Sequence, residues 1–182
     1  MSRPPRNEEI GALYHVTARG NDGQPIVTDD TDRKLWLTFL GRSVRRHAWR
    51  CLAYCLMTNH FHLVIQIPRG GLSRGMQQLN GGFAHSLNRR HGRTGHLFRN
   101  HFYSKQFELD SHLLEACRYV VLNPVRAGLC SDPSDWRWSS YRACAGLGTP
   151  EPFLAHRDLL GLFEGDAARS YAHFVALGIE SD

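Results

Sequence analysis

The chain has 182 residues, of which 42% are hydrophobic, so it is long enough to bury the core of one domain. Residues 1–150 contain 20 Lys and Arg against 11 Asp and Glu, whereas residues 151–182 contain 2 against 6, so a basic body is followed by an acidic tail. The five cysteines form no C-x-x-C pair and no apolar run approaches the roughly 20 residues of a membrane span, which argues against a disulfide framework, a thiolate zinc site and an integral membrane protein.

The first predicted strand covers residues 14–20, where small and apolar side chains alternate with His15 and Arg19. We expect these two polar side chains to share the solvent-facing side of the strand. A helix is predicted to follow and to run to about His47, because the aspartate-rich segment 29–32 supplies N-cap chemistry and apolar residues then recur at helical spacing.

Two histidines mark the third predicted strand. Residues 49–57 and 60–67 are strand-like and only Thr58 and Asn59 separate them, which predicts a hairpin. Side chains alternate along a strand, so His60 and His62 point to the side opposite the apolar residues and can bind one divalent ion. The alternative is that they are two polar residues of a half-solvated strand.

The remaining elements complete a βαββαβ order. A helix is predicted from about Leu72 to His91, interrupted by Gly81–Gly82, and a fourth strand covers residues 101–107. This order indicates an α+β, ferredoxin-like antiparallel sheet with two helices on one face and both histidines on the other face. A third helix, capped by Asp110–Ser111 and ended at Asn123–Pro124, is expected to approach the histidine face.

Basic residues are concentrated in the second half of this pattern. Residues 69–107 contain seven Lys and Arg and no Asp or Glu, with aromatic residues between them. Cationic and aromatic side chains together are typical of surfaces that contact nucleic acid, whereas a solvated helix face mixes both signs of charge. The alternative is that the excess of Arg over Lys reflects codon bias. We predict DNA contacts from Arg19, Arg74, Arg89, Arg90, Arg93, Arg99 and Lys105.

Four ordered motifs carry a resemblance to a known family. They are MTNHFH at residues 57–62, GHLFR at 95–99, YVVLNPVRAGL at 119–129 and WRWSSY at 136–141. Together they resemble the single-tyrosine HUH transposases, and among these the REP-associated tyrosine transposases. The resemblance covers about residues 14–142 and is far more specific than the pair of histidines.

The resemblance implies an enzyme that cleaves and rejoins single-stranded DNA beside REP-like hairpins through a 5′-phosphotyrosine intermediate. It implies Tyr119 as the nucleophile and His60, His62 and Asn123 as ligands of Mg²⁺ or Mn²⁺. Glu115, one helical turn before Tyr119, is a candidate for assisting its deprotonation. The alternatives are a non-catalytic, domesticated nucleic-acid-binding domain, for DNA or RNA, and a replication initiator or relaxase of the same chemistry.

We therefore expect an HUH transposase domain at residues 1–148 and a helical, acidic tail at residues 149–182. Trp136, Trp138 and Tyr141 are expected to pack on the edge of the sheet. The expected partner is single-stranded or hairpin DNA, with no membrane, in a cytoplasmic protein. The sequence leaves open whether the protein is a monomer or a homodimer.

Overall fold

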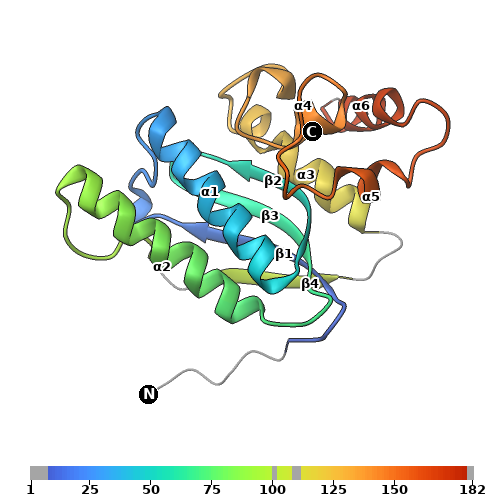
Figure 1. Ribbon diagram of the computed structural model, residues 1–182. Coiled ribbons are helices and arrows are strands. Elements are labelled where there is room, and N and C mark those ends of the chain that lie inside the picture. The colour runs from blue at the N-terminus through green and yellow to red at the C-terminus, as the bar shows by residue number, and fades with distance from the viewer. Residues whose placement is uncertain (1–7, 100–101, 108–111, 180–182) are drawn as a thin grey trace.

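A four-stranded antiparallel sheet forms the centre of the molecule. The computed structural model describes residues 8–99, 102–107 and 112–179 (Figure 1). The strands are β1 (Leu13–Arg19), β2 (Arg50–Leu56), β3 (His60–Gln66) and β4 (Tyr103–Phe107), in the spatial order β2-β3-β1-β4. This is the strand order of the ferredoxin-like fold, so the predicted fold class is confirmed.

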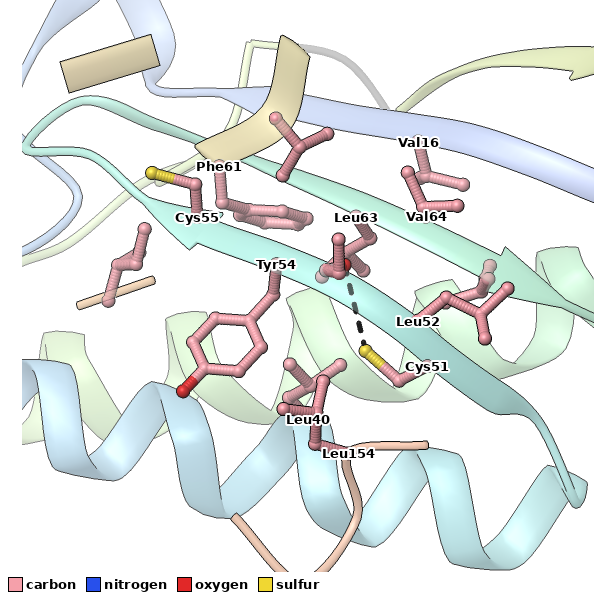
Figure 2. Packing of buried hydrophobic residues seen from close by; sticks show 14 of the residues in the cluster. Val16, Leu40, Cys51, Leu52, Tyr54, Cys55, Phe61, Leu63, Val64 and Leu154 are labelled. Carbon is pink, nitrogen blue, oxygen red and sulfur yellow. Dashed lines mark hydrogen bonds between the residues drawn. The ribbon is translucent and has the colours of Figure 1, made fainter. Parts of the chain in front are cut away.

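Helices α1 (Asp30–His47) and α2 (Leu72–His91) cover one face of the sheet (Figure 1). The side chain of Asp29 caps α1 by accepting a hydrogen bond of 2.9 Å from the backbone N–H of Asp32, as predicted. Trp36 of α1 packs against Phe61 of β3, with ring centroids 5.0 Å apart. Figure 2 shows Tyr54 and Cys51 pointing from β2 to the same side as Leu40 of α1.

Two glycines of α2 allow neighbouring aromatic rings to pack closely against this helix. A Cβ at Gly75 would lie 2.1 Å from the ring of Trp49, and a Cβ at Gly82 would lie 2.5 Å from the ring of Phe39. Helix α2 runs through Gly81 and Gly82 as one helix, so the predicted interruption is wrong. The loss of helix propensity at Gly82 is offset by close packing against α1, which a larger residue would prevent.

Helix α3 (Leu113–Arg126) lies against the opposite face of the sheet and contacts β2 and β3. It continues past Pro124, so the predicted end at Asn123–Pro124 is wrong. Pro124 has no N–H to donate to the carbonyl of Val120, and the side-chain Nδ2 of Asn123 donates to that carbonyl at 3.4 Å instead. The predicted cap at Asp110–Ser111 lies outside the described residues.

The edge of β2 is covered by the segment that follows α3 and the 3₁₀ turn Pro133–Asp135. The backbone N–H of Leu56 donates to the carbonyl of Trp138 at 2.9 Å, and the indole N–H of Trp136 donates to the carbonyl of Leu56 at 3.0 Å. Both tryptophans are partly buried against the core at this edge, as predicted. Pairing these groups protects a strand that would otherwise expose its hydrogen-bonding edge.

The described part of the acidic tail, residues 149–179, packs on the same core as the sheet. Its helices α5 (His156–Leu160) and α6 (Ala167–Leu177) lie beside α3 and β2, together with the preceding short helix α4 (Tyr141–Cys144) (Figure 1). Tyr171 and Val175 of α6 are fully buried in one hydrophobic cluster with residues of β2 and α3. None of the described helices is long and apolar enough to cross a membrane.

Candidate active site

Three histidines lie on the sheet face that α1 and α2 leave uncovered. The register of β1 and β3 pairs Thr17 with His62 and Arg19 with His60, so alternation places His15 on this face as well. The rings of His60 and His62 are 4.9 Å apart between centroids, and the rings of His15 and His62 are 5.2 Å apart with an interplanar angle of 17°. The sheet therefore gathers three imidazoles from two neighbouring strands.

His62 is the most buried of the three, with 7% of its surface exposed. Its Nδ1 lies 2.9 Å from Nε2 of His15, whereas its Nε2 is buried and has no hydrogen-bond partner among the described residues. Burial, with small contributions from His60 and His15, lowers the pKa of His62 to about 3. The ring is therefore neutral at neutral pH, which is the form that binds a metal ion.

The other two histidines are also kept neutral. Burial lowers the pKa of His60, and the positive charge of Arg19 lowers it further. Burial likewise lowers the pKa of His15, to which the positive charge of Lys105 adds. All three imidazoles are therefore neutral at neutral pH, next to the positive charges of Arg19 and Lys105.

The ring of Tyr119, in α3, contacts the histidines on this face of the sheet. Its ring lies edge-on to the ring of His15 at 5.6 Å and to the ring of His62 at 5.8 Å between centroids. The residue is 43% exposed, and the guanidinium of Arg126 lies 5.1 Å from the centre of its ring. A phenol is thus held at the histidines while remaining open to a substrate from solvent.

Asn123 lies one helical turn after Tyr119 and is tied to its own helix. Its Nδ2 donates to the carbonyl of Tyr119 at 2.8 Å and more weakly to that of Val120. These bonds fix the amide plane and use its nitrogen. The oxygen Oδ1 is the atom through which an amide coordinates a hard cation.

Glu115 forms an ion pair with Arg118, one turn along α3. The guanidinium of Arg118 also lies 4.5 Å from the centre of the Phe174 ring of α6 and donates to the Phe174 carbonyl. Arg118 therefore connects Glu115 with the contact between α3 and α6. The proposed assistance of Glu115 in deprotonating Tyr119 stays a prediction.

The seven predicted DNA-binding residues do not share one surface. Register places Lys105 beside His15 and Arg19 beside His60 on the histidine face, and the backbone N–H of Arg99 donates to the carbonyl of Arg19. The other four lie in or directly after α2, in the layer on the opposite face: Arg74, Arg89, Arg90 and Arg93. Arg90 is bound to Asp29 and Asp32 of the α1 N-terminus.

Two features of the histidine face depend on strand register. Alternation along β1 placed His15 on the polar side, but the contact with His62 depends on strand register and carries no local signal. Tyr103 of β4 pairs with Thr17, which pairs on its other side with His62. Tyr103 is 63% exposed. An exposed aromatic residue beside such a site provides a surface on which a nucleic-acid base can stack.

The donor set suits a mixed metal site. Across the residues that the structure covers, no group of three His, Cys, Asp or Glu is arranged to hold a metal ion. Two neutral imidazoles, one with a buried and unpartnered Nε2, can nevertheless combine with an amide oxygen and with oxygens of a substrate.

Known proteins share the sequence pattern and the fold of this chain. A REP-associated tyrosine transposase assigned in Haemophilus influenzae is 22% identical over 159 residues, which cover 78% of this chain and 86% of that protein. The solved structure of a REP-associated tyrosine transposase bound to a REP hairpin shares the fold, with a TM-score of 0.68 and 18% identity over 92% of this chain and 93% of that one. Residues 10–121 match the family described as "Transposase IS200 like", and the chain belongs to this family of transposases.

Proposed function

We propose that the protein is a metal-dependent transposase that cleaves and rejoins single-stranded DNA beside a REP-like hairpin, with Tyr119 as nucleophile. The observation that carries this proposal is the edge contact between Tyr119 and His62, whose Nε2 has no hydrogen-bond partner in the described parts of the chain. The hairpin bound by the similar solved structure supports the choice of substrate.

His60, His62 and the amide oxygen of Asn123 are the proposed ligands of Mg²⁺ or Mn²⁺. When bound, such an ion acts as a Lewis acid that stabilises the charge developing on the phosphoryl oxygens. The residues themselves contribute fixed positions: the sheet register holds both imidazoles, and two hydrogen bonds to the helix hold the Asn123 amide. The site leaves open positions for substrate oxygens.

Tyr119 performs the transfer. Its Oη attacks phosphorus while the bond from phosphorus to the 3′-oxygen breaks, so a 5′-phosphotyrosine and a free 3′-hydroxyl form. The proton of the phenol leaves to a base and the departing 3′-oxygen gains one. Rejoining is the reverse step, by a 3′-hydroxyl, and needs no ATP because the ester conserves the energy of the broken bond.

Glu115 is the proposed acceptor of the phenol proton. It forms an ion pair with Arg118, and this pair would have to open before the carboxylate could accept the proton. The guanidinium of Arg126 lies 5.1 Å from the centre of the Tyr119 ring. A guanidinium has no acceptor atom, so Arg126 is not the base.

The DNA strand is proposed to cross the histidine face. Arg19 and Lys105 lie beside His60 and His15 and would bind phosphates on either side of the site, while Tyr103 would stack a base. Arg74, Arg89 and Arg93 of the α2 layer are proposed to contact the hairpin stem, whereas Arg90 is bound to Asp29 and Asp32. Because Tyr119 and His62 meet within one chain, we propose that cleavage occurs in cis and that a monomer suffices.

The deciding experiment is the formation of a covalent adduct. A hairpin oligonucleotide with a single-stranded 3′ flank is incubated with the protein and Mn²⁺, and denaturing electrophoresis shows a protein band of increased mass. A non-catalytic binding domain, the alternative function, would bind the same oligonucleotide and give no adduct with any flank. Omitting Mn²⁺ and adding EDTA provides the matched control.

A further inference from the structure

We propose that His15 is the positioning residue of the site: it fixes the tautomer and the ring orientation of His62. The consequence for metal affinity rests on the proposed function, whereas the tautomer itself is a property of the metal-free protein.

The contact between the two rings is set by the sheet. His15 pairs with Val64 and His62 pairs with Thr17, so the histidines are diagonal neighbours on adjacent strands. Their nitrogens, Nε2 of His15 and Nδ1 of His62, are 2.9 Å apart, and the ring centroids are 5.2 Å apart with an interplanar angle of 17°, so the rings lie side by side in nearly the same plane. Neither ring can turn without breaking this bond or entering the buried surroundings of His62.

The proton positions follow from the two nitrogens of His62. A neutral imidazole has one donor nitrogen and one acceptor nitrogen. If Nε2 of His62 carried the proton, that N–H would be buried with no acceptor among the described residues, which is unfavourable. The proton therefore lies on Nδ1 and is donated to Nε2 of His15. His15 in turn carries its own proton on Nδ1.

This arrangement prepares His62 for coordination. The lone pair of Nε2 points away from His15, so a cation that reached this buried nitrogen would be bound without a change of tautomer. A hydrogen-bond acceptor at the other ring nitrogen also increases the basicity of a coordinating histidine. His15 itself need not touch the metal: its contribution passes through His62, and its edge contact with Tyr119 keeps the three rings in one packed group.

Two substitutions separate the hydrogen bond from the packing. His15→Gln keeps a side-chain oxygen that accepts a bond from Nδ1 of His62, whereas His15→Leu keeps bulk and removes the acceptor. His85→Leu is the control, because His85 is an exposed residue of α2 in the other layer. Circular dichroism and thermal unfolding identify which variants fold.

The first measurement is nitrogen-15 NMR of the histidine rings in metal-free protein at neutral pH. We expect a single Nδ1–H tautomer for His62 in the wild type, the same tautomer in His15→Gln and His85→Leu, and a mixture of tautomers in His15→Leu. An Nε2–H tautomer in the wild type, or an unchanged Nδ1–H tautomer in a folded His15→Leu, overturns the proposal. If His15→Leu does not fold, the wild-type and His15→Gln spectra decide.

The second measurement is the affinity of the protein for Mn²⁺ alone, determined by electron paramagnetic resonance. We expect a 10–100-fold loss in His15→Leu, most of it restored in His15→Gln, and none in His85→Leu. Equal affinity in wild type and a folded His15→Leu overturns the role of His15 in metal binding. A wild type that fails to bind Mn²⁺ contradicts the metal site of the proposed function, while the NMR result still decides the positioning role.

Discussion

Asp32, in the first turn of α1, binds both Arg90 and His91 at the end of α2, although its own carboxylate is fully buried. It also accepts hydrogen bonds from the backbone N–H and the hydroxyl of Thr28, at 2.9 and 2.7 Å. Burial raises the pKa of this carboxyl, but the hydrogen bonds from His91, Thr28 and Arg90 outweigh burial and hold the pKa well below its usual range. This carboxylate joins the two helices that form the outer layer of the fold.

We expect Asp32→Asn to reduce the free energy of unfolding at pH 7 by about 2–3 kcal/mol, because an amide cannot replace the charged acceptor of Arg90. The contribution of Asp32 is present above the unfolded pKa of about 3.9 and is lost as pH falls below it. Urea unfolding from pH 6 to pH 2 should therefore show the difference between wild type and variant closing in acid. Asp30→Asn, at an exposed ion pair with Arg137, should change stability by less than about 0.5 kcal/mol.

Tyr119→Phe removes one hydroxyl and keeps the ring that packs against His15 and His62. We expect unchanged affinity for hairpin DNA and no covalent adduct on a denaturing gel. Tyr103→Phe is the control, since Tyr103 is the exposed tyrosine of β4, and it should form the adduct normally. An adduct that survives in Tyr119→Phe and disappears in Tyr103→Phe would move the nucleophile to β4.

His60→Ala together with His62→Ala should abolish adduct formation and Mn²⁺ binding while leaving most DNA binding intact. His62 is buried and hydrogen-bonded to His15, so the double variant should also lower the free energy of unfolding by about 1–3 kcal/mol. Thermal unfolding measures this cost, and fluorescence anisotropy measures DNA binding. An unfolded double variant would favour a structural role for the pair.

Lys105→Ala should weaken single-stranded DNA binding through the loss of one phosphate contact. The slope of log affinity against log salt should become less steep by about 0.7, the value for one phosphate of a single strand. Arg90→Ala provides a contrast, because Arg90 is bound to Asp29 and Asp32. We expect it to reduce stability and to leave the slope nearly unchanged. A slope that is identical in wild type and Lys105→Ala would remove Lys105 from the DNA path.

Tyr103→Ala should reduce affinity for single-stranded DNA by about 1–3 kcal/mol if its ring stacks one base. Tyr103→Phe keeps the stacking surface and should bind as the wild type does. Fluorescence anisotropy with an unstructured oligonucleotide measures both. Equal affinity of Tyr103→Ala and wild type would place the DNA strand away from β4.

Sequence patterns of short range determined much of this protein. Alternation along β3 separates His60 and His62 from the core residues, because the side chains of a strand alternate whatever the partner strands are. The bounds of α2 and the aspartate cap of α1 followed from local capping and periodicity. The order of these elements was enough to predict the ferredoxin-like sheet.

Only the tertiary structure decided which residues meet. The placement of α3 brings Tyr119 into contact with His62, and strand register forms the hydrogen bond between His15 and His62. Register also places Arg19 and Lys105 on the histidine face, away from the arginines of α2. No local sequence pattern encodes either. Two local rules also failed. Gly82 packs against Phe39 of α1 and does not interrupt α2. Helix α3 continues past Pro124, and the side chain of Asn123 donates to the Val120 carbonyl, to which Pro124 has no N–H to donate.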